Sequence, residues 1–374
     1  MRNLYFYVKT YGTKSFQEFP FNEVDSLLLS QLSYLNLDLV IPKIQEKKPS
    51  VSLVSLLSSE LIGELSKETL DEKRNRKLLN LLMTAPRYEG LKMNYLMEQF
   101  HVEKVEQFSA VTFLFEEFSY IAYRGTDLTL IGWFEDFNMA LLDVIPSQED
   151  AATYLNKISL LLPECSFYIG GHSKGGNLAV YAALSCSKEI KNRIISIFDH
   201  DGPGFNRDIF QSKEYLEIEA KIFKTTCKEA RVGILLHHSE RMSFVDSRSL
   251  GILQHDPYNW KITKQGRFKL VRNANLISRT FEKTVNNFIE TTSLEDRRKF
   301  LDIMYQLSVA HPKATIFDFK RKPVTYSIGI RRRYKGLTLN QKIFLKKTLK
   351  RYRVIWRANF QMYLKRRIRF KDKT

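Results

Sequence analysis

The spacing of apolar residues divides the chain into parts with different predicted structure. Apolar residues at helical spacing predict a helix within 21–40 and a second, rich in Leu, Glu and Lys, within 47–80. Near Ala110 the pattern changes to β-branched and aromatic runs, which predict two adjacent strands over 110–115 and 118–123. The first hundred residues are therefore expected to be helical, with a sheet beginning after them.

Beyond residue 130, strand-like and helix-like patterns alternate. Such alternation is typical of an α/β fold, in which helices flank a mostly parallel sheet. The predicted helices cover 131–142, 148–162, 177–185, 275–290 and 293–308, and the predicted strands cover 166–170, 193–198 and 232–236.

Charge separates the end of the chain from its body. The 374 residues include 59 Lys and Arg against 41 Asp and Glu, yet residues 320–374 hold 20 of the basic residues and one acid. We therefore expect a near-neutral body over 1–310, with a helical part over 20–105 and a core over 106–310. A basic extension over 311–374 follows. Hydrophobic residues make up 44% of the chain, which excludes wholesale disorder.

The basic extension is predicted to contain a long helix that begins near Gln341. Three interpretations compete. The helix packs on the body, or residues 341–370 dock on an anionic membrane surface, or the basic side chains bind nucleic acid through phosphates. The last is less favoured, because no helix-turn-helix, zinc or RNA-binding motif is present. The residues expected on its apolar face are Leu345, Leu349, Tyr352, Trp356, Phe360 and Tyr363.

The cellular compartment is inferred from three absences in the sequence. The three cysteines, Cys165, Cys186 and Cys227, are unevenly spaced and predict no disulfide framework. The first residues do not form a signal peptide, and no apolar stretch is long enough to span a bilayer. We expect a cytoplasmic protein, peripheral to the membrane if the basic extension docks there.

The run Gly171-His172-Ser173-Lys174-Gly175 has the G-x-S-x-G pattern of a nucleophile elbow. An apolar strand precedes it and an Ala-rich helix follows, which is the arrangement that holds a serine hydroxyl exposed on a strained turn. The alternative is a Gly-rich turn or phosphate-binding loop in which Ser173 has no chemical role. We expect Ser173 to be a nucleophile.

A serine nucleophile in this arrangement needs an acid and then a histidine later in the chain. His255 is the preferred base, because a short apolar run precedes it and a turn follows, whereas His237 and His238 end a predicted strand. For the acid we favour Glu240, which follows the predicted strand 232–236. Asp201, which begins a turn, and Asp246 are the alternatives.

Four segments resemble the class 3 (triacylglycerol) lipases. Residues 123–126, followed by Trp133 and Asp136, are similar to an "FRG[ST]…W…D" stretch of that family, and 171–176 match its elbow. Residues 202–206 and 254–260 resemble its later Gly-Pro turn and its catalytic-histidine segment. The chain resembles still more closely an uncharacterised bacterial lipase-like family, long labelled a domain of unknown function, over about residues 1–300.

The resemblance implies an α/β-hydrolase of the class 3 lipase type, with Ser173 as nucleophile and His255 as base. It also implies an oxyanion hole formed by the backbone N–H groups of Thr126 and Lys174. Lys174 stands where those lipases have an apolar residue, so it either favours an anionic substrate or leaves the elbow as a solvated side chain. Their "D-x-V-P" acid stretch is absent here.

We expect a serine hydrolase that cleaves an acyl or lipid ester through an acyl-enzyme, with Glu240 orienting His255. The alternative is a catalytically silent hydrolase fold that serves as a membrane-associated or binding module. No metal or organic cofactor is expected, because the sequence has no zinc-binding, Cys-pair or nucleotide-binding glycine motif.

Overall fold

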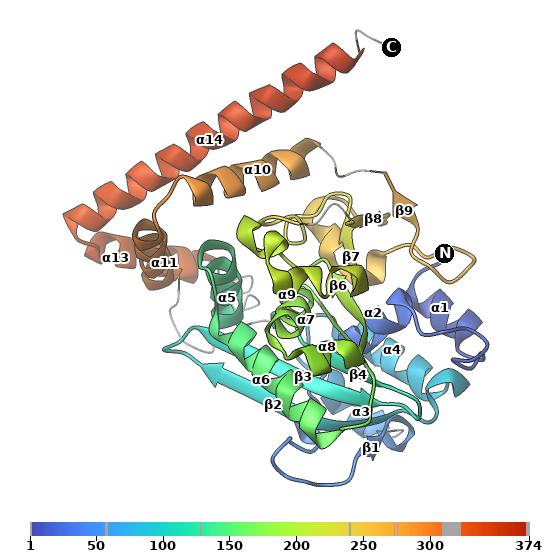
Figure 1. Ribbon diagram of the computed structural model, residues 1–374. Coiled ribbons are helices and arrows are strands. Elements are labelled where there is room, and N and C mark those ends of the chain that lie inside the picture. Colours follow the sequence, from blue (N-terminus) through green and yellow to red (C-terminus); the bar gives the residue numbers. More distant parts are fainter. Residues whose placement is uncertain are drawn as a thin grey trace.

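A computed structural model describes residues 2–56, 59–127, 129–238, 241–272, 274, 276–308 and 323–371. Within them a mixed sheet of nine strands runs in chain order across the molecule (Figure 1). β4 to β8 pair in parallel, whereas the pairs before β4 and the pair β8–β9 are antiparallel. The sheet is therefore mixed rather than mostly parallel. The strands are β1 Val51–Ser52, β2 Lys92–His101, β3 Glu106–Leu114, β4 Ser119–Tyr123, β5 Phe167–His172, β6 Ile194–His200, β7 Ile222–Cys227, β8 Ser243–Val245 and β9 Leu270–Val271.

The crossover helices pack on one face of this sheet. Parallel strands joined in sequential order by crossovers of one hand place every crossover on the same side. Ile121 and Ile169 of the central strands face this layer, where Tyr154 and Leu178 pack with them in one core. The helices between β4 and β7 are α5 Leu130–Leu141, α6 Pro146–Leu161, α7 Lys174–Ser185, α8 Lys188–Arg193 and α9 Lys213–Leu216.

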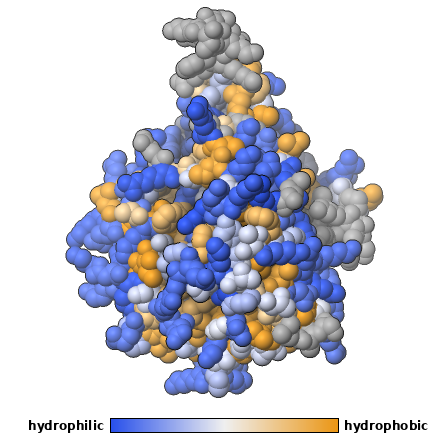
Figure 2. All heavy atoms as spheres, turned by 90° about the vertical axis from the view of Figure 1, so that its right-hand side faces the viewer, coloured by the Kyte–Doolittle hydropathy of each residue, from blue (hydrophilic) through white to orange (hydrophobic). Residues whose placement is uncertain are grey.

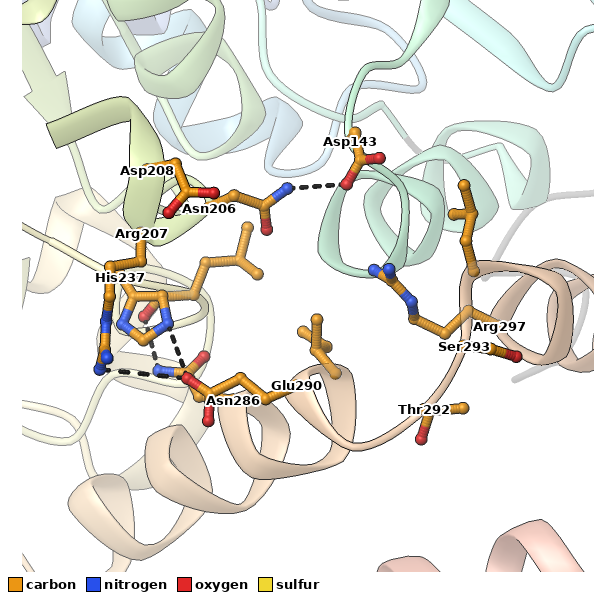
Figure 3. A pocket seen from close by; sticks show the side chains of 13 residues that line it. Asp143, Asn206, Arg207, Asp208, His237, Asn286, Glu290, Thr292, Ser293 and Arg297 are labelled. Atoms are coloured by element: carbon orange, nitrogen blue, oxygen red, sulfur yellow. Dashed lines mark hydrogen bonds and ion pairs between the residues drawn. The ribbon is translucent and has the colours of Figure 1, made fainter. Parts of the chain in front are cut away.

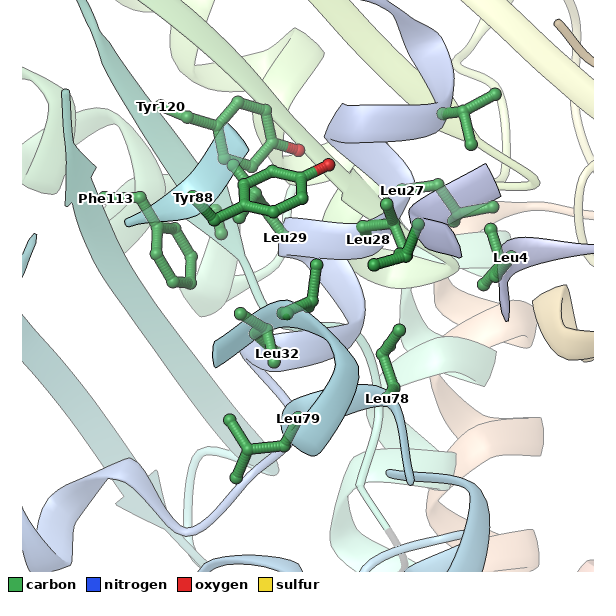
Figure 4. Close-up of a cluster of buried hydrophobic side chains, with 14 of the residues drawn as sticks. Leu4, Leu27, Leu28, Leu29, Leu32, Leu78, Leu79, Tyr88, Phe113 and Tyr120 are labelled. Carbon is green, nitrogen blue, oxygen red and sulfur yellow. The ribbon is translucent and has the colours of Figure 1, made fainter. Parts of the chain in front are cut away.

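The N-terminal helices cover the opposite face, which the crossovers leave bare. Because strand side chains alternate, Tyr120 points into this second core, together with leucines of α2 and α4 (Figure 4). The Tyr120 hydroxyl lies 2.9 Å from Ser26 Oγ and 2.8 Å from Ser30 Oγ. The helices are α1 Leu4–Tyr11, α2 Glu23–Leu32, α3 Ser59–Ser66 and α4 Glu72–Met83.

A buried ion pair joins two parts of the N-terminal layer. Asp25 of α2 accepts bonds from Arg87 Nε at 3.0 Å and Nη2 at 2.7 Å, and from the Tyr88 hydroxyl at 2.6 Å. Both charged side chains are fully buried. Removing one partner would leave an uncompensated buried charge, so this pair fixes how α2 sits against the segment before β2.

Of the C-terminal helices, α10 and α14 lie above the core, and α11 packs beside α5 (Figure 1). α14 runs antiparallel along α10: Asn359 Nδ2 lies 3.3 Å from Thr284 Oγ1, and the Tyr352 ring lies 5.8 Å from that of Phe288. The helix thus packs on the body, which was one of the three interpretations, but the buried face differs in part from the predicted apolar face. Leu349 is 40% exposed, whereas Leu345, Thr348 and Asn359 are buried. The helices are α10 Leu276–Glu290, α11 Leu294–Ser308, α13 Pro323–Gly336 and α14 Leu339–Lys371.

The predicted strand over 232–236 is wrong: those residues form turns, and β7 precedes them at Ile222–Cys227. β7 was missed because three of its residues are polar, although all three are buried. The predicted boundary at residues 310 and 311 lies outside the described residues. The short 3₁₀ helices are η1 Leu37–Leu39, η2 Leu53–Leu56, η3 Pro86–Tyr88, η4 Arg207–Gln211, η5 Glu219–Lys221, η6 Gly251–His255 and η7 Pro257–Asn259.

In the part of the chain that the structure describes, no helix is both long and apolar enough to cross a bilayer. On the face that carries α1 and β9, hydrophilic residues predominate and hydrophobic ones are interspersed among them (Figure 2).

Candidate active site

Ser173 occupies a strained turn between β5 and α7. Its backbone has φ 59° and ψ −133°, a left-handed conformation that a residue with a side chain rarely adopts. The turn needs glycine nearby, because a Cβ atom on Gly175 would lie 2.0 Å from the carbonyl oxygen of Tyr123. Ser173 N–H donates to His200 O at 2.8 Å, which fixes the turn against β6. The local geometry is that of a nucleophile elbow.

A continuous chain of hydrogen bonds links Ser173, His255 and Asp201. His255 Nε2 lies 3.0 Å from Ser173 Oγ, and His255 Nδ1 lies 2.6 Å from Asp201 Oδ2. The three residues follow the carboxyl ends of β5, β8 and β6, which lie at the same edge of the parallel part of the sheet. With Nδ1–H donated to the carboxylate, Nε2 is left to accept the serine proton.

Asp201 is fully buried and held from several sides. Its backbone has φ 56°, and its Oδ1 accepts from the Thr226 hydroxyl and from Cys227 N–H at 3.3 Å. Gly233 closes against the same oxygen, since a Cβ atom there would lie 2.0 Å from Oδ1. These contacts fix the position of the carboxylate beside His255.

Within the described residues, the carboxylate that contacts His255 is Asp201; the favoured Glu240 lies outside those residues. The preference for Glu240 depended on a strand over 232–236 that does not form. Asp246 is also separate from His255, because its carboxylate pairs with Lys261 at 3.0 Å and Lys269 at 3.2 Å.

A second buried ion pair supports the turn that carries Asp201. Lys224 Nζ donates to Asp199 Oδ2 and to Gly202 O, both at 2.5 Å, and Gly202 N–H donates to Asp199 Oδ1 at 2.8 Å. Burial raises the pKa of Asp199, and the neighbouring Lys224 opposes that shift. This ion pair fixes the residues before and after Asp201 in the chain. From the sequence alone, Asp201 could be recognised only as the start of a turn.

The segment after β8 presents His255 from a fixed position. The carbonyl of Gln254 accepts from Cys227 Sγ and from Trp260 Nε1, each at 2.8 Å. Asp256 caps η7 and pairs with Arg74 Nη2 of α4 at 2.6 Å. Gln254, Asp256 and Trp260 therefore anchor the loop on both sides of His255.

His172 is a site neighbour that sequence reasoning treated only as part of the elbow. Its Nε2 donates to the backbone carbonyl of His255 at 2.9 Å, and its Nδ1 lies 3.3 Å from the Tyr34 hydroxyl. Burial lowers the pKa of His172 well below the usual range, so the ring is neutral. Its place as the last residue of β5, directly before Ser173, is the signal that could have pointed to it.

The segment after β4 lies against the elbow. A Cβ atom on Gly125 would lie 2.4 Å from His172 O, which shows how closely the two backbones approach. Thr126 follows, and its Oγ1 donates to Asp136 Oδ1 at 2.6 Å. Burial raises the pKa of Asp136 to about 6, against the opposing charge of Lys174. Thr126 thus follows a segment that lies against the turn of Ser173, and its part in an oxyanion hole stays a prediction.

The Lys174 side chain turns away from the solvent and into the protein. It is fully buried, and Nζ donates to Glu135 Oε2 at 2.5 Å and to the Gln107 side chain at 3.1 Å. Both expectations for this side chain are wrong: it is neither solvated nor free to attract an anionic substrate. Its backbone N–H, in the first turn of α7, remains without a partner inside that helix.

The remaining candidate histidines lie elsewhere. His237 Nε2 lies 3.4 Å from Glu290 of α10, in a different cavity, and His238 is held near the backbone of Gly204. In the described part of the chain no group of three or more acidic, His or Cys side chains could hold a metal ion.

Comparison with known proteins places the fold in a family. The Mbeg1-like family model matches residues 82–306, which is more than half of the chain and includes Ser173, Asp201 and His255. The crystal structure of M37 lipase is similar at a TM-score of 0.37 and 16% identity, over 57% of this chain and 69% of that one. Comparison with curated proteins gives no match. The chain belongs to the Mbeg1-like family.

Proposed function

We propose that the protein is a serine hydrolase of the class 3 lipase-like α/β-hydrolase type, which cleaves carboxylic esters. The observation that carries the proposal is the hydrogen-bonded chain from Ser173 through His255 to Asp201. Two of its members, Ser173 and Asp201, have left-handed backbone conformations that cost free energy and are typical of active sites. The buried supports of Asp201 and His255 are consistent with this role.

In the proposed reaction, Ser173 Oγ attacks the ester carbonyl carbon while His255 Nε2 takes the hydroxyl proton. The tetrahedral intermediate collapses, the carbon–oxygen bond to the alcohol breaks, and the alcohol leaves with the proton from His255. Water then attacks the acyl-enzyme carbonyl and gives a proton to His255; the bond between the acyl carbon and Ser173 Oγ breaks, His255 returns the proton to Ser173 Oγ, and the carboxylic acid leaves. Asp201 keeps Nδ1 protonated and stabilises the imidazolium that forms in both halves of the reaction.

The oxyanion is proposed to bind between the backbone N–H groups of Thr126 and Lys174. The N–H at the start of α7 points along the positive end of the helix dipole, which favours a developing negative charge. The buried bond of Lys174 to Glu135 holds the first turn of that helix in place. The hydrogen bond from Thr126 to Asp136 likewise holds Thr126 in place.

The substrate is proposed to be an acyl or lipid ester, and docking of residues 341–370 on an anionic membrane remains a prediction. The structure makes part of the predicted apolar face unavailable to lipid, because Tyr352 packs against Phe288 of α10. Trp356 and Phe360 stack on each other with ring centroids 5.0 Å apart, and both are half-buried.

The test is labelling of the purified full-length protein with a fluorophosphonate, which an activated serine attacks with loss of fluoride. We expect labelling of the wild type, loss of labelling in Ser173→Ala, and near-complete loss in His255→Ala. The matched controls are Ser185→Ala, at the exposed end of α7, and His101→Gln, on an exposed strand end. Both should label as the wild type does.

Folded wild-type protein that does not label would contradict the proposal. The alternative, a silent hydrolase fold that acts as a membrane-associated or binding module, would then be preferred. Labelling that survives in Ser173→Ala would also overturn it, because another nucleophile would be responsible. Circular dichroism of each variant separates loss of chemistry from loss of the fold.

A further inference from the structure

The outward face of α14 carries a row of basic side chains. Residues 323–371, which form α13, α14 and the link between them, contain 16 Lys and Arg and no Asp or Glu. Four exposed basic residues of α14 follow one another at steps of 4, 3 and 4, so they share one face of the helix. We name them the basic row: Lys346, Lys350, Arg353 and Arg357.

The opposite face of α14 is occupied by the protein itself. Tyr352 and Asn359 contact α10, and Leu345 is buried. Arg351, at the edge of this packed face, donates to the backbone carbonyl of Thr291. The helix is thus held with the basic row turned away from α10 and toward the solvent.

No acidic side chain neutralises the basic row within the described ranges, where no ion pair includes a residue of α14. Glu290 of α10 pairs instead with His237 at 3.4 Å and with Arg207 at 4.0 Å, beside a cavity on the core side of that helix (Figure 3). Burial raises the pKa of Glu282, the other acid of α10, and Arg279 opposes that shift. The positive charge of the row is therefore presented to a partner outside the chain.

Exposed aliphatic side chains accompany the basic row. Ile343 lies three residues before Lys346, and Leu364 lies seven residues after Arg357, so both continue the same face. Val354 lies beside the row, and all three aliphatic side chains are at least 38% exposed. The stems of lysine and arginine add apolar surface of their own. The outward face of α14 therefore combines positive charge with apolar groups.

The charge of this face requires an anionic partner, and its aliphatic side chains favour a lipid surface over nucleic acid. Nucleic acids are bound through phosphates and through bases that stack on aromatic rings. Aliphatic side chains add little to such contacts, whereas they enter the boundary between lipid headgroups and acyl chains. The 33 residues of α14 form a rod about 50 Å long, and a rod can meet a flat membrane along its whole length.

We propose that the outward face of α14 docks the protein on an anionic lipid membrane. The basic row contacts the lipid phosphates, and the three aliphatic side chains enter the headgroup boundary. Four basic residues near such a surface raise the affinity by about 100- to 1,000-fold. The docking face differs from the apolar face expected from the sequence, because Tyr352 of that face packs on Phe288. Docking involves none of the catalytic residues, so it does not depend on the serine chemistry proposed above.

The test is co-sedimentation of the full-length protein with lipid vesicles. One set contains phosphatidylcholine alone, and the other contains phosphatidylcholine with about one third phosphatidylglycerol. We expect at least about 100-fold tighter binding to the anionic vesicles, and a loss of about tenfold or more when salt rises from about 0.1 to 0.5 M. A DNA duplex of random sequence, at the same salt concentrations, is the competing partner.

Neutralising the basic row tests whether this face makes the contact. The variant that combines Lys346→Gln, Lys350→Gln, Arg353→Gln and Arg357→Gln should bind anionic vesicles about 100-fold more weakly. The matched control removes the same charge from exposed positions of the body, and it should lose less than about threefold. Its substitutions are Lys9→Gln, Lys73→Gln, Lys157→Gln and Lys188→Gln.

A further variant separates lipid from nucleic acid. Ile343→Ser with Val354→Ser and Leu364→Ser keeps every charge, and we expect about tenfold weaker binding to anionic vesicles with DNA binding unchanged. All these positions are exposed, and circular dichroism checks that each variant is folded. The proposal is overturned if the wild type binds DNA more tightly than anionic vesicles, if the body control loses as much as the basic-row variant, or if the aliphatic variant binds vesicles as the wild type does.

Discussion

The ring of His172 lies 4.6 Å from that of His255, and its Nε2 donates to the His255 backbone carbonyl at 2.9 Å. The residue next to the proposed nucleophile thus holds the backbone of the proposed base. Because Tyr34 reaches the other side of the His172 ring, the N-terminal helical layer contributes to the site through one buried imidazole.

Replacing His172 tests this positioning role. We expect His172→Phe to lower kcat by about 10- to 100-fold with little change in KM, since a small displacement of a reacting group is costly. His172→Gln keeps a donor near the place of Nε2 and should recover part of the loss. The measurement is steady-state hydrolysis of a soluble ester. Equal effects of both variants, or a change confined to KM, would argue against positioning.

The identity of the acid can be tested by neutralising each candidate carboxylate in turn. Asp201→Asn should lower kcat by about 10³- to 10⁴-fold, because His255 would lose the partner that fixes its tautomer. Glu240→Gln and Asp246→Asn should each leave kcat within about twofold of the wild type. A large loss in Glu240→Gln instead would restore the assignment made from the sequence.

The buried pair of Lys174 and Glu135 predicts a large stability effect. Lys174→Met would leave the Glu135 carboxylate buried and unpaired, so we expect a loss of about 3–5 kcal/mol in the free energy of unfolding. The double variant Lys174→Met, Glu135→Leu should be less destabilised than the single variant. Urea denaturation measures both, with Lys157→Met, exposed on α6, as the control.

Asp136 predicts a pH-dependent stability. Its pKa is about 6 in the fold against an ordinary 3.8, so the stability tied to its protonated form is present at low pH and lost as pH rises through about 6. Asp136→Asn should therefore be more stable than the wild type at pH 7, by about 2–3 kcal/mol. The gain should vanish below about pH 4. A gain that does not change with pH would contradict this cause.

Alanine substitutions can distinguish the face of α14 that packs in the structure from the face predicted by the sequence. Tyr352→Ala removes a ring that contacts Phe288, and we expect it to cost about 1–3 kcal/mol of stability. Leu349→Ala, at a position 40% exposed, should change stability by less than about 0.5 kcal/mol. Thermal unfolding of the full chain provides the comparison, and the reverse order would favour the face expected from the sequence.

Local periodicity predicted the elements that surround the site. The strands that became β4 and β5 and the helices that became α5 and α7 were expected within a few residues of their observed ends, because each has a continuous pattern of its own. The elbow followed from that context, and His255 from its need for a late histidine.

The acid could not be ranked from local patterns. β7 contains three polar residues, Lys224, Thr225 and Thr226. Their side chains form hydrogen bonds with Asp199, His200 and Asp201, and because they are polar the sequence pattern did not indicate a strand. The direction of Lys174 was equally hidden, because its partner Glu135 is 39 residues away along the chain. In both cases the fold satisfies a buried polar group with a distant one, and only the assembled structure pairs them.

The covering of one sheet face by the N-terminal helices has a consequence for biosynthesis. Ser26 of α2 lies 3.0 Å from His200 Nε2 of β6, a bond between residues 174 positions apart. The leucine-rich α2 therefore leaves the ribosome long before the strand that completes its partner surface. Such distant closure slows folding and leaves apolar surface exposed meanwhile. The apolar face of α2 should therefore stay uncovered in the newly made chain until β6 has been synthesised.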